Sequence, residues 1–389
     1  MKKTTYPILL LLVLVITNSC IEEFNAGTNE FEDVIVIEAS LTNEFKHQKV
    51  ILSRTYKFEE NQPEAESGAI IQITSSSNNT YTFQETEPGV YLSDIQFSAL
   101  PNIDYQLNVA TSNGREYTSQ PTKLTSSSSN IENVYATREV NEEGVDGIRI
   151  YIDSFDPTNS SQYYSYSFEE TYQIIAPYWK SDQLVLVPAT ATTPLTFAVV
   201  PRTQEERVCY VTLNSQGRLI TKSDLLTEDR VSNFFVKSFP VDDIRNSSRY
   251  SIIVKQYTLS AESYNFHKTL NDFSNSESLF SQNQPGFVAG NIFSGNNPNE
   301  KVLGFFEVSS VAQQRIFFNR SDYITDQYPW EDCEPYVAST PPLTTLIRTN
   351  KVSWFQGIPS DPEPILVVNR KCGDCTEFGS NIRPSFWID

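Results

Sequence analysis

Histidine is nearly absent from this sequence of 389 residues, which contains only His47 and His267. A serine–histidine–aspartate triad or a zinc centre built on imidazoles would need at least one of them. The chain also has no GxSxG, SxxK or HExxH motif and no glycine-rich phosphate-binding loop. We therefore interpret both histidines as surface or packed residues. The sequence argues against an enzyme, and we predict no catalytic residue, no metal site and no cofactor.

Apolar runs of membrane-spanning length are also missing. The run at the N-terminus, Ile8 to Ile16, has nine residues, whereas a spanning helix needs roughly 20. Lys2 and Lys3 precede this run, and small polar residues follow it up to Cys20. This arrangement is typical of a secretory signal, so we expect residues 1–19 to be a signal peptide rather than a retained anchor.

Cys20 follows the small residue Ser19, as the acylated cysteine does in a bacterial lipobox. The match is imperfect, because Thr17 stands where an aliphatic residue is usual and Ile16 lies one position further out. The alternative is an ordinary secretory signal with an incidental cysteine. A lipidated Cys20 would carry a diacyl group and an N-acyl chain. Since stable anchoring takes more than one acyl chain, these would hold the protein on a membrane.

Glu22, Glu23 and Phe24 follow Cys20 directly. Acidic residues and an aromatic at this place look like the surface-export signal of Bacteroidota lipoproteins. The alternative is a solvated acidic linker. We expect residues 20–32 to form an acidic tether, and we expect the protein to be lipid-anchored in the outer membrane and to face the cell exterior.

Basic residues are scarce, with 29 lysines and arginines against 48 acids and a net charge of −19. Phosphate contacts need clustered lysine and arginine, so we predict no nucleic-acid partner. An acidic surface is also repelled by anionic membranes, which suits a protein held away from its membrane by a tether.

Four cysteines remain beyond Cys20, namely Cys209, Cys333, Cys372 and Cys375. An even number in an exported chain favours two disulfides, and we expect Cys372 and Cys375 each to reach one of the two distant cysteines. The pairing itself stays open. The CGDC motif lacks the βαβ surroundings of a redox site, and zinc would need a second paired knuckle.

Short strand patterns fill residues 33–125. Hairpins are predicted at Ala69–Glu85, with Ser75–Asn79 as the turn, and at Ile103–Gln120, with the strong turn signal Asn113-Gly114. Several short strands at this spacing predict an Ig-like β-sandwich. The fold class is therefore mainly β, with this N-terminal sandwich followed by a second domain.

The low-complexity stretch Leu124–Asn130 predicts a domain boundary. Residues 130–389 read as a larger β-rich domain with one or two helices and a C-terminal cysteine cluster. Its tyrosine-rich strand at Gln162–Ile175 has a period-two stripe that we interpret as core. One helix is predicted to begin after Ser260, a plausible N-cap.

Two pairs of aromatic residues lie in loop-like stretches, Tyr178 with Trp179 and Tyr328 with Trp330. Tyrosine and tryptophan are enriched in binding patches, so we take these four as candidate contact residues. Packing over the sheet edges is the alternative. Asp146, Asp153 and Asp156 could assist a calcium site, but turn and solvent roles are favoured for them.

Several segments recur together in a fixed order and resemble one family. These segments are VIVIEASLT, VILSRTYKF, AIIQI, GVYLSD, YQLNVATSNGREYTS, YYSYSFEETYQIIAP, CYVT, SLFSQNQPGFVAGNIFS, VLGFFEVSSV and CGDCTEFGSNIRPSFW. The set is similar to the Bacteroidota outer-membrane lipoprotein family catalogued as domain of unknown function 4249. Ala39 departs from the glycine that the family usually has after the strand glutamate. The resemblance implies a β-sandwich first domain and an accessory role beside TonB-dependent transporters, and it implies no catalytic residues.

Three functions remain open at this point. We favour a surface-exposed lipoprotein that acts as an accessory binding or lid component of a TonB-dependent nutrient transporter. The alternative is a structural or adhesive cell-surface lipoprotein. A carboxylate-dependent glycan hydrolase is the least favoured, because no sequence spacing marks a pair of acids in a cleft.

Overall fold

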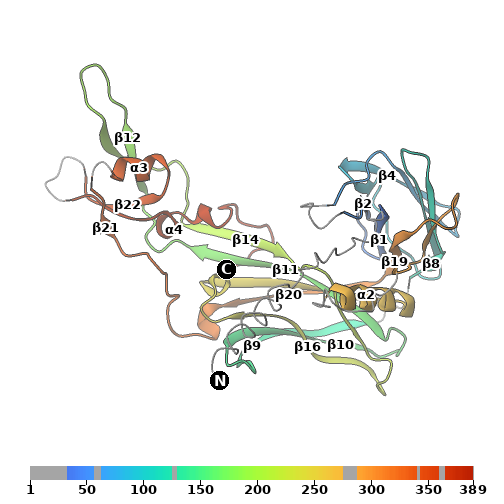
Figure 1. The fold of residues 1–389 in the computed structure, drawn as a ribbon. Helices are drawn as coiled ribbons and strands as arrows, with labels where there is room; N and C mark the ends of the chain where they lie inside the picture. The colour runs from blue at the N-terminus through green and yellow to red at the C-terminus, as the bar shows by residue number, and fades with distance from the viewer. Residues whose placement is uncertain are drawn as a thin grey trace, which may run out of the picture.

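A computed structural model describes residues 33–56, 63–124, 129–274, 287–339, 342–358 and 364–388 (Figure 1). Within these residues the protein is mainly β, which confirms the predicted fold class. No helix in the described ranges has the length and apolar character that a bilayer crossing requires. The predicted signal peptide, Cys20 and the motif Glu22, Glu23 and Phe24 lie outside the described residues.

The first domain is one sheet of ten strands, in the order β18-β7-β6-β3-β4-β5-β2-β1-β19, with β8 pairing beside β6. Its strands are β1 (Ile35–Thr42), β2 (Lys49–Arg54), β3 (Ile70–Ser75), β4 (Thr80–Glu87), β5 (Val90–Ser93), β6 (Asp104–Ala110), β7 (Glu116–Ser119), β8 (Thr122–Lys123), β18 (Ile292–Ser294) and β19 (Val302–Ser309). Alternation along β1 turns Ile35, Ile37, Ala39 and Leu41 into the core.

This sheet curls until its two edge strands approach each other. Asn291, just before β18, donates through Nδ2 to the carbonyl oxygen of Phe306 in β19 at 2.9 Å. Its Oδ1 accepts from the Phe306 backbone N–H at 2.7 Å. The first domain is therefore a near-barrel, which we call the barrel-like domain. The prediction of two stacked sheets for residues 33–125 is corrected here, because one continuous sheet encloses the core.

Two of the ten strands come from far along the chain. β19 pairs in parallel with β1, from Ile35 opposite Val302 to Thr42 opposite Ser309, and β18 pairs with β7. The segment before the predicted boundary at Leu124–Asn130 thus receives strands from residues 292–309. No local signal in the sequence indicates this return.

The second domain is a sandwich of two sheets, and we call it the sandwich domain. One sheet has the order β16-β10-β9, and the other has the order β14-β11-β17-β20 with β15 beside β11. The strands are β9 (Asn130–Val140), β10 (Asp146–Asp156), β11 (Tyr163–Ile175), β14 (Val208–Asn214), β15 (Leu219–Lys222), β16 (Asp229–Pro240), β17 (Arg249–Thr258) and β20 (Val311–Asn319). The predicted tyrosine stripe lies in its core, where Tyr164 and Tyr166 are buried.

β19 and β20 connect the two domains through a single residue, Ser310. The continuous stretch KVLGFFEVSSVAQQRIFF (Lys301–Phe318) therefore contributes two strands to different sheets. The predicted helix is α2 (Ala261–Ser274), and the Ser260 hydroxyl caps it by accepting from the Ser263 backbone N–H at 3.1 Å. Figure 1 shows α2 beside the strands of the barrel-like domain.

A smaller C-terminal region lies at the opposite end of the molecule from the barrel-like domain (Figure 1). It contains the sheet β21-β23-β22 from the end of the chain and the hairpin β12-β13 from its middle. Side chains of the two pack in one apolar cluster. Its elements are β12 (Asp182–Val187), β13 (Thr196–Pro201), β21 (Tyr336–Val337), α3 (Pro342–Arg348), β22 (Val352–Gln356), β23 (Leu366–Asn369), α4 (Arg370–Gly373) and η3 (Cys375–Glu377). The described residues also contain the 3-10 helices η1 (Ile244–Asn246), between β16 and β17, and η2 (Arg320–Asp322), directly after β20.

Two disulfides lie at this end of the molecule, and one of them joins this region to the sandwich domain. Cys209 in β14 pairs with Cys375, and Cys333 pairs with Cys372. Both C-terminal cysteines thus reach distant partners, which confirms the expectation from sequence and settles the pairing. Cys209, Cys372 and Cys375 have no exposed surface, so the bonds are enclosed in packed interior.

Candidate functional site

A cavity of about 450 Å³ lies where the barrel-like domain meets α2 and the turn before β15. One wall is the outer face of β1, β2 and β19, and the other is α2 with Gly217 and Arg218. Because both domains contribute walls, we call it the interdomain cavity. Binding sites occur preferentially at such domain junctions.

The outer face of β19 forms the most distinctive wall. Val302, Phe306 and Val308 point into the barrel core, so the alternating residues Leu303, Phe305 and Glu307 point outward. Leu303 and Phe305 are half-buried. Glu307, further along the same face, is buried where the sandwich domain covers the strand.

One face of α2 forms the opposite wall. Phe266 and Leu270 are one helical turn apart and therefore project on the same side. The ring of Phe266 lies 5.4 Å from that of Phe305, measured between centroids. This aromatic contact across the domain boundary holds the helix against the barrel-like domain.

The carboxylate of Glu307 is the polar centre of the site. It accepts from Arg218 Nη1 at 2.8 Å and from Ser309 Oγ at 2.7 Å through Oε1. Its Oε2 accepts from Ser263 Oγ at 2.7 Å and lies 3.2 Å from His267 Nε2. A buried acid of this kind is stable only when its oxygens are satisfied, and here both are.

The charge state of Glu307 follows from these contacts. Burial on its own would raise the pKa of the carboxyl group. The positive charge of Arg218 and the hydrogen bond from His267 outweigh that effect and hold the pKa well below its usual range. Glu307 is therefore an anion at neutral pH, which does not suit the role of a proton donor.

Arg218 retains donors for a second partner. Among the described residues its guanidinium donates only through Nη1, to Glu307 and more distantly to Ser165 Oγ at 3.5 Å. Its Cζ also lies 5.2 Å from the centroid of the Tyr257 ring. The site thus combines apolar walls with a fixed cation, which suits binding rather than bond cleavage.

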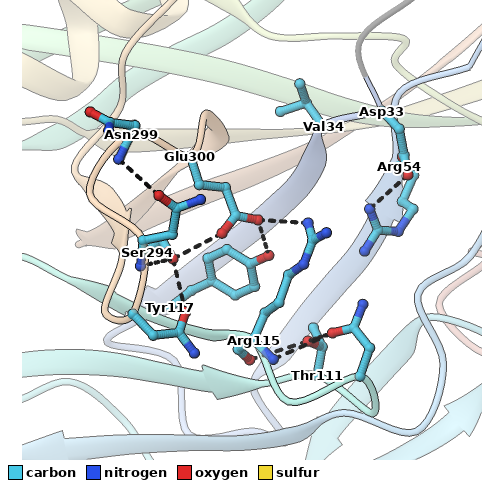
Figure 2. A network of polar contacts seen from close by, with 12 residues as sticks. Asp33, Val34, Arg54, Thr111, Arg115, Tyr117, Ser294, Asn299 and Glu300 are labelled. Carbon is cyan, nitrogen blue, oxygen red and sulfur yellow. Dashed lines mark hydrogen bonds and ion pairs between the residues drawn. The ribbon is translucent and has the colours of Figure 1, made fainter.

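Other buried acids are also held by donors. Glu170 accepts from Tyr250 Oη at 2.6 Å and pairs with Lys237, and Asp229 accepts from Tyr164 Oη at 2.8 Å. Figure 2 shows a further network, in which Glu300 accepts from Tyr117 Oη at 2.7 Å, from Ser294 Oγ at 2.9 Å and from Arg115 Nη1 at 2.8 Å.

The Glu300 network fastens the turn after β18 to β7 of the barrel-like domain. Burial and the hydrogen bond to Glu300 raise the pKa of Tyr117 to about 12, so its hydroxyl stays a donor. In the same way, hydrogen bonds outweigh burial and lower the pKa of Glu300. These contacts stabilise the fold and leave no carboxyl group of this network poised for catalysis.

The four predicted contact aromatics lie outside the interdomain cavity. Tyr178 packs beside the Cys333–Cys372 disulfide, and its ring meets that of Phe355 at 5.5 Å. Trp179 packs against the core of the sandwich domain. The ring centroids of Tyr328 and Trp330 lie 5.1 Å apart, and both residues border a groove of about 600 Å³. Their role as a contact surface stays a prediction.

The three aspartates that could assist a calcium site have separate partners. Asp146 pairs with Arg138, and Asp153 accepts from the Asn233 backbone N–H at 2.6 Å. Asp156 accepts from the Ser161 hydroxyl at 2.7 Å. In the ranges that the structure covers, no group of three His, Cys, Asp or Glu residues has the arrangement to hold a metal ion.

Sequence reasoning missed Arg218 and Glu307, and it placed His267 only as a surface or packed residue. One signal was present, because Glu307 is the lone charged residue in the apolar stretch VLGFFEVSSV. An acid inside a buried strand requires a partner. Nothing local indicated that the partner would be Arg218, 89 positions away.

The fold and site define a structural class: a disulfide-bonded β protein with two domains and a cavity between them. The chain belongs to the family described as domain of unknown function DUF4249, whose model matches residues 21–315. Every residue that lines the interdomain cavity falls inside that range. The family description carries no activity.

Comparison with solved structures finds a DUF4785 family protein from Legionella pneumophila, known from a crystal structure. The alignment has 9% identity and a TM-score of 0.18, and it covers 57% of this chain and 51% of that one. A likeness at this level carries no argument about fold or function. No curated protein matches the chain.

Proposed function

We propose that this protein is a surface-exposed, lipid-anchored binding protein of the bacterial outer membrane. It serves as an accessory or lid component of a TonB-dependent nutrient transporter and has no catalytic role of its own. The observation that carries the binding role is the interdomain cavity, whose walls come from both domains and contain a buried, fully satisfied charge centre.

The cellular location is supported by the N-terminal sequence and by the cysteines. A short apolar run ends at Ile16, four residues before Cys20, and acids with an aromatic follow the cysteine. Two disulfides among the remaining cysteines suit an oxidising compartment outside the cytoplasm. A Bacteroidota source would fit the export motif Glu22, Glu23 and Phe24.

The proposed partner is a TonB-dependent transporter. This partnership is supported by the family resemblance and by the paired aromatics Tyr328 and Trp330, which border a groove on the sandwich domain. Aromatic residues of this kind anchor protein interfaces. A rigid β scaffold tethered by acyl chains suits repeated docking onto a membrane partner.

Co-purification tests the partnership. An affinity tag on the C-terminus of the chromosomal protein is used to recover it from outer membranes solubilised in mild detergent. We expect a TonB-dependent transporter in stoichiometric amount. A double substitution, Tyr328→Ala with Trp330→Ala, is expected to release the transporter, whereas Leu225→Ala at an exposed site serves as the matched control. Recovery of the wild-type protein alone contradicts the proposal.

A further inference from the structure

The walls of the interdomain cavity are largely apolar and come from opposite sides. Leu303 and Phe305 project from β19, Ile51 projects from β2, and Phe266 projects from α2. Leu303, Phe305 and Ile51 stay half-buried, so part of their apolar surface faces the cavity. A cavity of about 450 Å³ falls in the size range of sites for drug-sized molecules.

Arg218 supplies a directional cation at the edge of these walls. Glu307 occupies its Nη1, and among described residues Nε and Nη2 have no protein acceptor. These two groups form one side of the planar guanidinium fork, with parallel N–H bonds that match the two oxygens of an acid group. Because the contact with Glu307 fixes the guanidinium, little entropy is lost when a second acid binds.

The other charges near the cavity are balanced in sign, and among them the negative charge of Glu38 also acts on Arg218. Glu307 is already satisfied by four neighbours, so it does not repel an added anion as an isolated charge would. Lys49 and Glu38 are exposed on the barrel-like wall and carry opposite signs. Among described residues neither forms an ion pair, and their charges offset each other.

We propose that the interdomain cavity binds an amphipathic anion, with an apolar body against Leu303, Phe305 and Phe266 and an acid group on Arg218. This inference rests on the binding role proposed above and names the chemical class of its ligand. The acid group is a carboxylate or a sulfonate, since both present two oxygens in the plane of the fork.

Two fluorescent probes test the proposal. 8-Anilino-1-naphthalenesulfonate carries an aromatic body and one acid group, and N-phenyl-1-naphthylamine has the same body without the acid. Each probe is titrated into a protein of residues 20–389, which lacks the predicted signal peptide. This protein carries Cys20→Ser, so that no acyl chains compete for the probes. We expect saturable binding of the sulfonate at one site per chain.

Arg218→Lys separates the acid contact from the apolar contact. Lysine keeps the positive charge beside Glu307 but lacks the planar fork. We expect the affinity for the sulfonate to fall about tenfold, as for loss of one charge-assisted hydrogen bond, while the affinity for the uncharged probe stays the same. An equal change for both probes overturns the assignment of the acid to Arg218.

Leu303→Trp tests the location without touching any charge. The larger side chain fills the cavity, so both probes are expected to bind at least about tenfold more weakly, which is the effect of losing a buried apolar group. Ile70→Trp is the matched control, because Ile70 is an exposed aliphatic residue on β3 of the same sheet.

Equal binding by these two variants, or no saturable binding of the sulfonate to the parent chain, overturns the proposal. The assay contains no membrane and no transporter. A failure here is therefore distinct from a failure of the co-purification experiment, which tests the partnership alone.

Discussion

Arg218 Nη1 and Glu307 Oε1 lie 2.8 Å apart, although Arg218 belongs to the sandwich domain and Glu307 to the barrel-like domain. The side chain of Glu307 is 4% exposed and that of Arg218 is 28% exposed. This ion pair therefore links two domains that meet at the cavity.

Glu307→Gln is expected to destabilise the protein strongly. The substitution leaves Arg218 without its counter-ion in a largely buried place, and removing one partner of a buried pair costs roughly 3 kcal/mol. Urea unfolding followed by tryptophan fluorescence measures the change. The exposed acid Glu143 provides the control, and Glu143→Gln is expected to shift the midpoint very little. Equal midpoints for the two variants contradict the structural role of the pair.

The stabilisation by Glu307 also depends on pH. Because its pKa is lowered from 4.5 in the folded protein, the unfolded chain takes up a proton first as the pH falls. The stabilisation is complete above about pH 5 and is lost as the pH falls through the folded pKa. We expect the stability difference between wild type and Glu307→Gln to shrink from pH 7 to about pH 3, as urea unfolding at each pH would show. A constant difference contradicts the lowered pKa.

Removal of the two disulfides is expected to have unequal effects. Cys209 and Cys375 are 166 positions apart, and Cys333 and Cys372 are 39 apart. The loop-entropy model gives about 5 kcal/mol for the longer loop and about 4 kcal/mol for the shorter one. We expect the Cys209→Ser, Cys375→Ser variant to unfold at the lower temperature, because it also leaves hydroxyls in the sandwich core. Calorimetry checks the order, and a reversed order contradicts this account.

Gly304 is expected to tolerate no side chain. It has a φ of 155°, and an added Cβ would lie 2.2 Å from the carbonyl oxygen of Ile37 on β1. Gly304→Ala therefore separates β1 from β19 and destabilises the protein, by roughly 3 kcal/mol if the strain resembles other overpacked sites. Gly295→Ala is the control, because its Cβ would meet only ordinary van der Waals contacts, the nearest at 3.7 Å. Thermal unfolding compares the two, and equal melting temperatures contradict the tight β1–β19 approach.

The elements that sequence predicted correctly are those with local causes. The Ser75–Asn79 and Asn113-Gly114 turns depend on neighbouring residues, and Gly114 adopts the expected positive φ of 81°. Ser260 caps α2 through an N–H three positions away. Such signals are contained in a short window and need no knowledge of the rest of the chain.

The features that sequence did not predict are those made by distant pairings. The parallel match of β1 with β19 joins residues more than 260 positions apart, and alternation alone cannot select that partner. Because of the same return of the chain, the first domain is a near-barrel and not the predicted sandwich. It also brings Glu307 beside Arg218, so the candidate site became visible only with the tertiary structure.

The proposed function depends most on the predicted lipid anchor at Cys20, which would place the protein on a bacterial envelope. Cells that express the wild-type protein or the Cys20→Ala variant are grown with an alkyne analogue of palmitate, and the purified proteins are then tested for the label. We predict labelled wild-type protein in the outer-membrane fraction and unlabelled variant protein that does not fractionate with membranes. Absence of label from the wild type, or membrane association of the variant, contradicts the account.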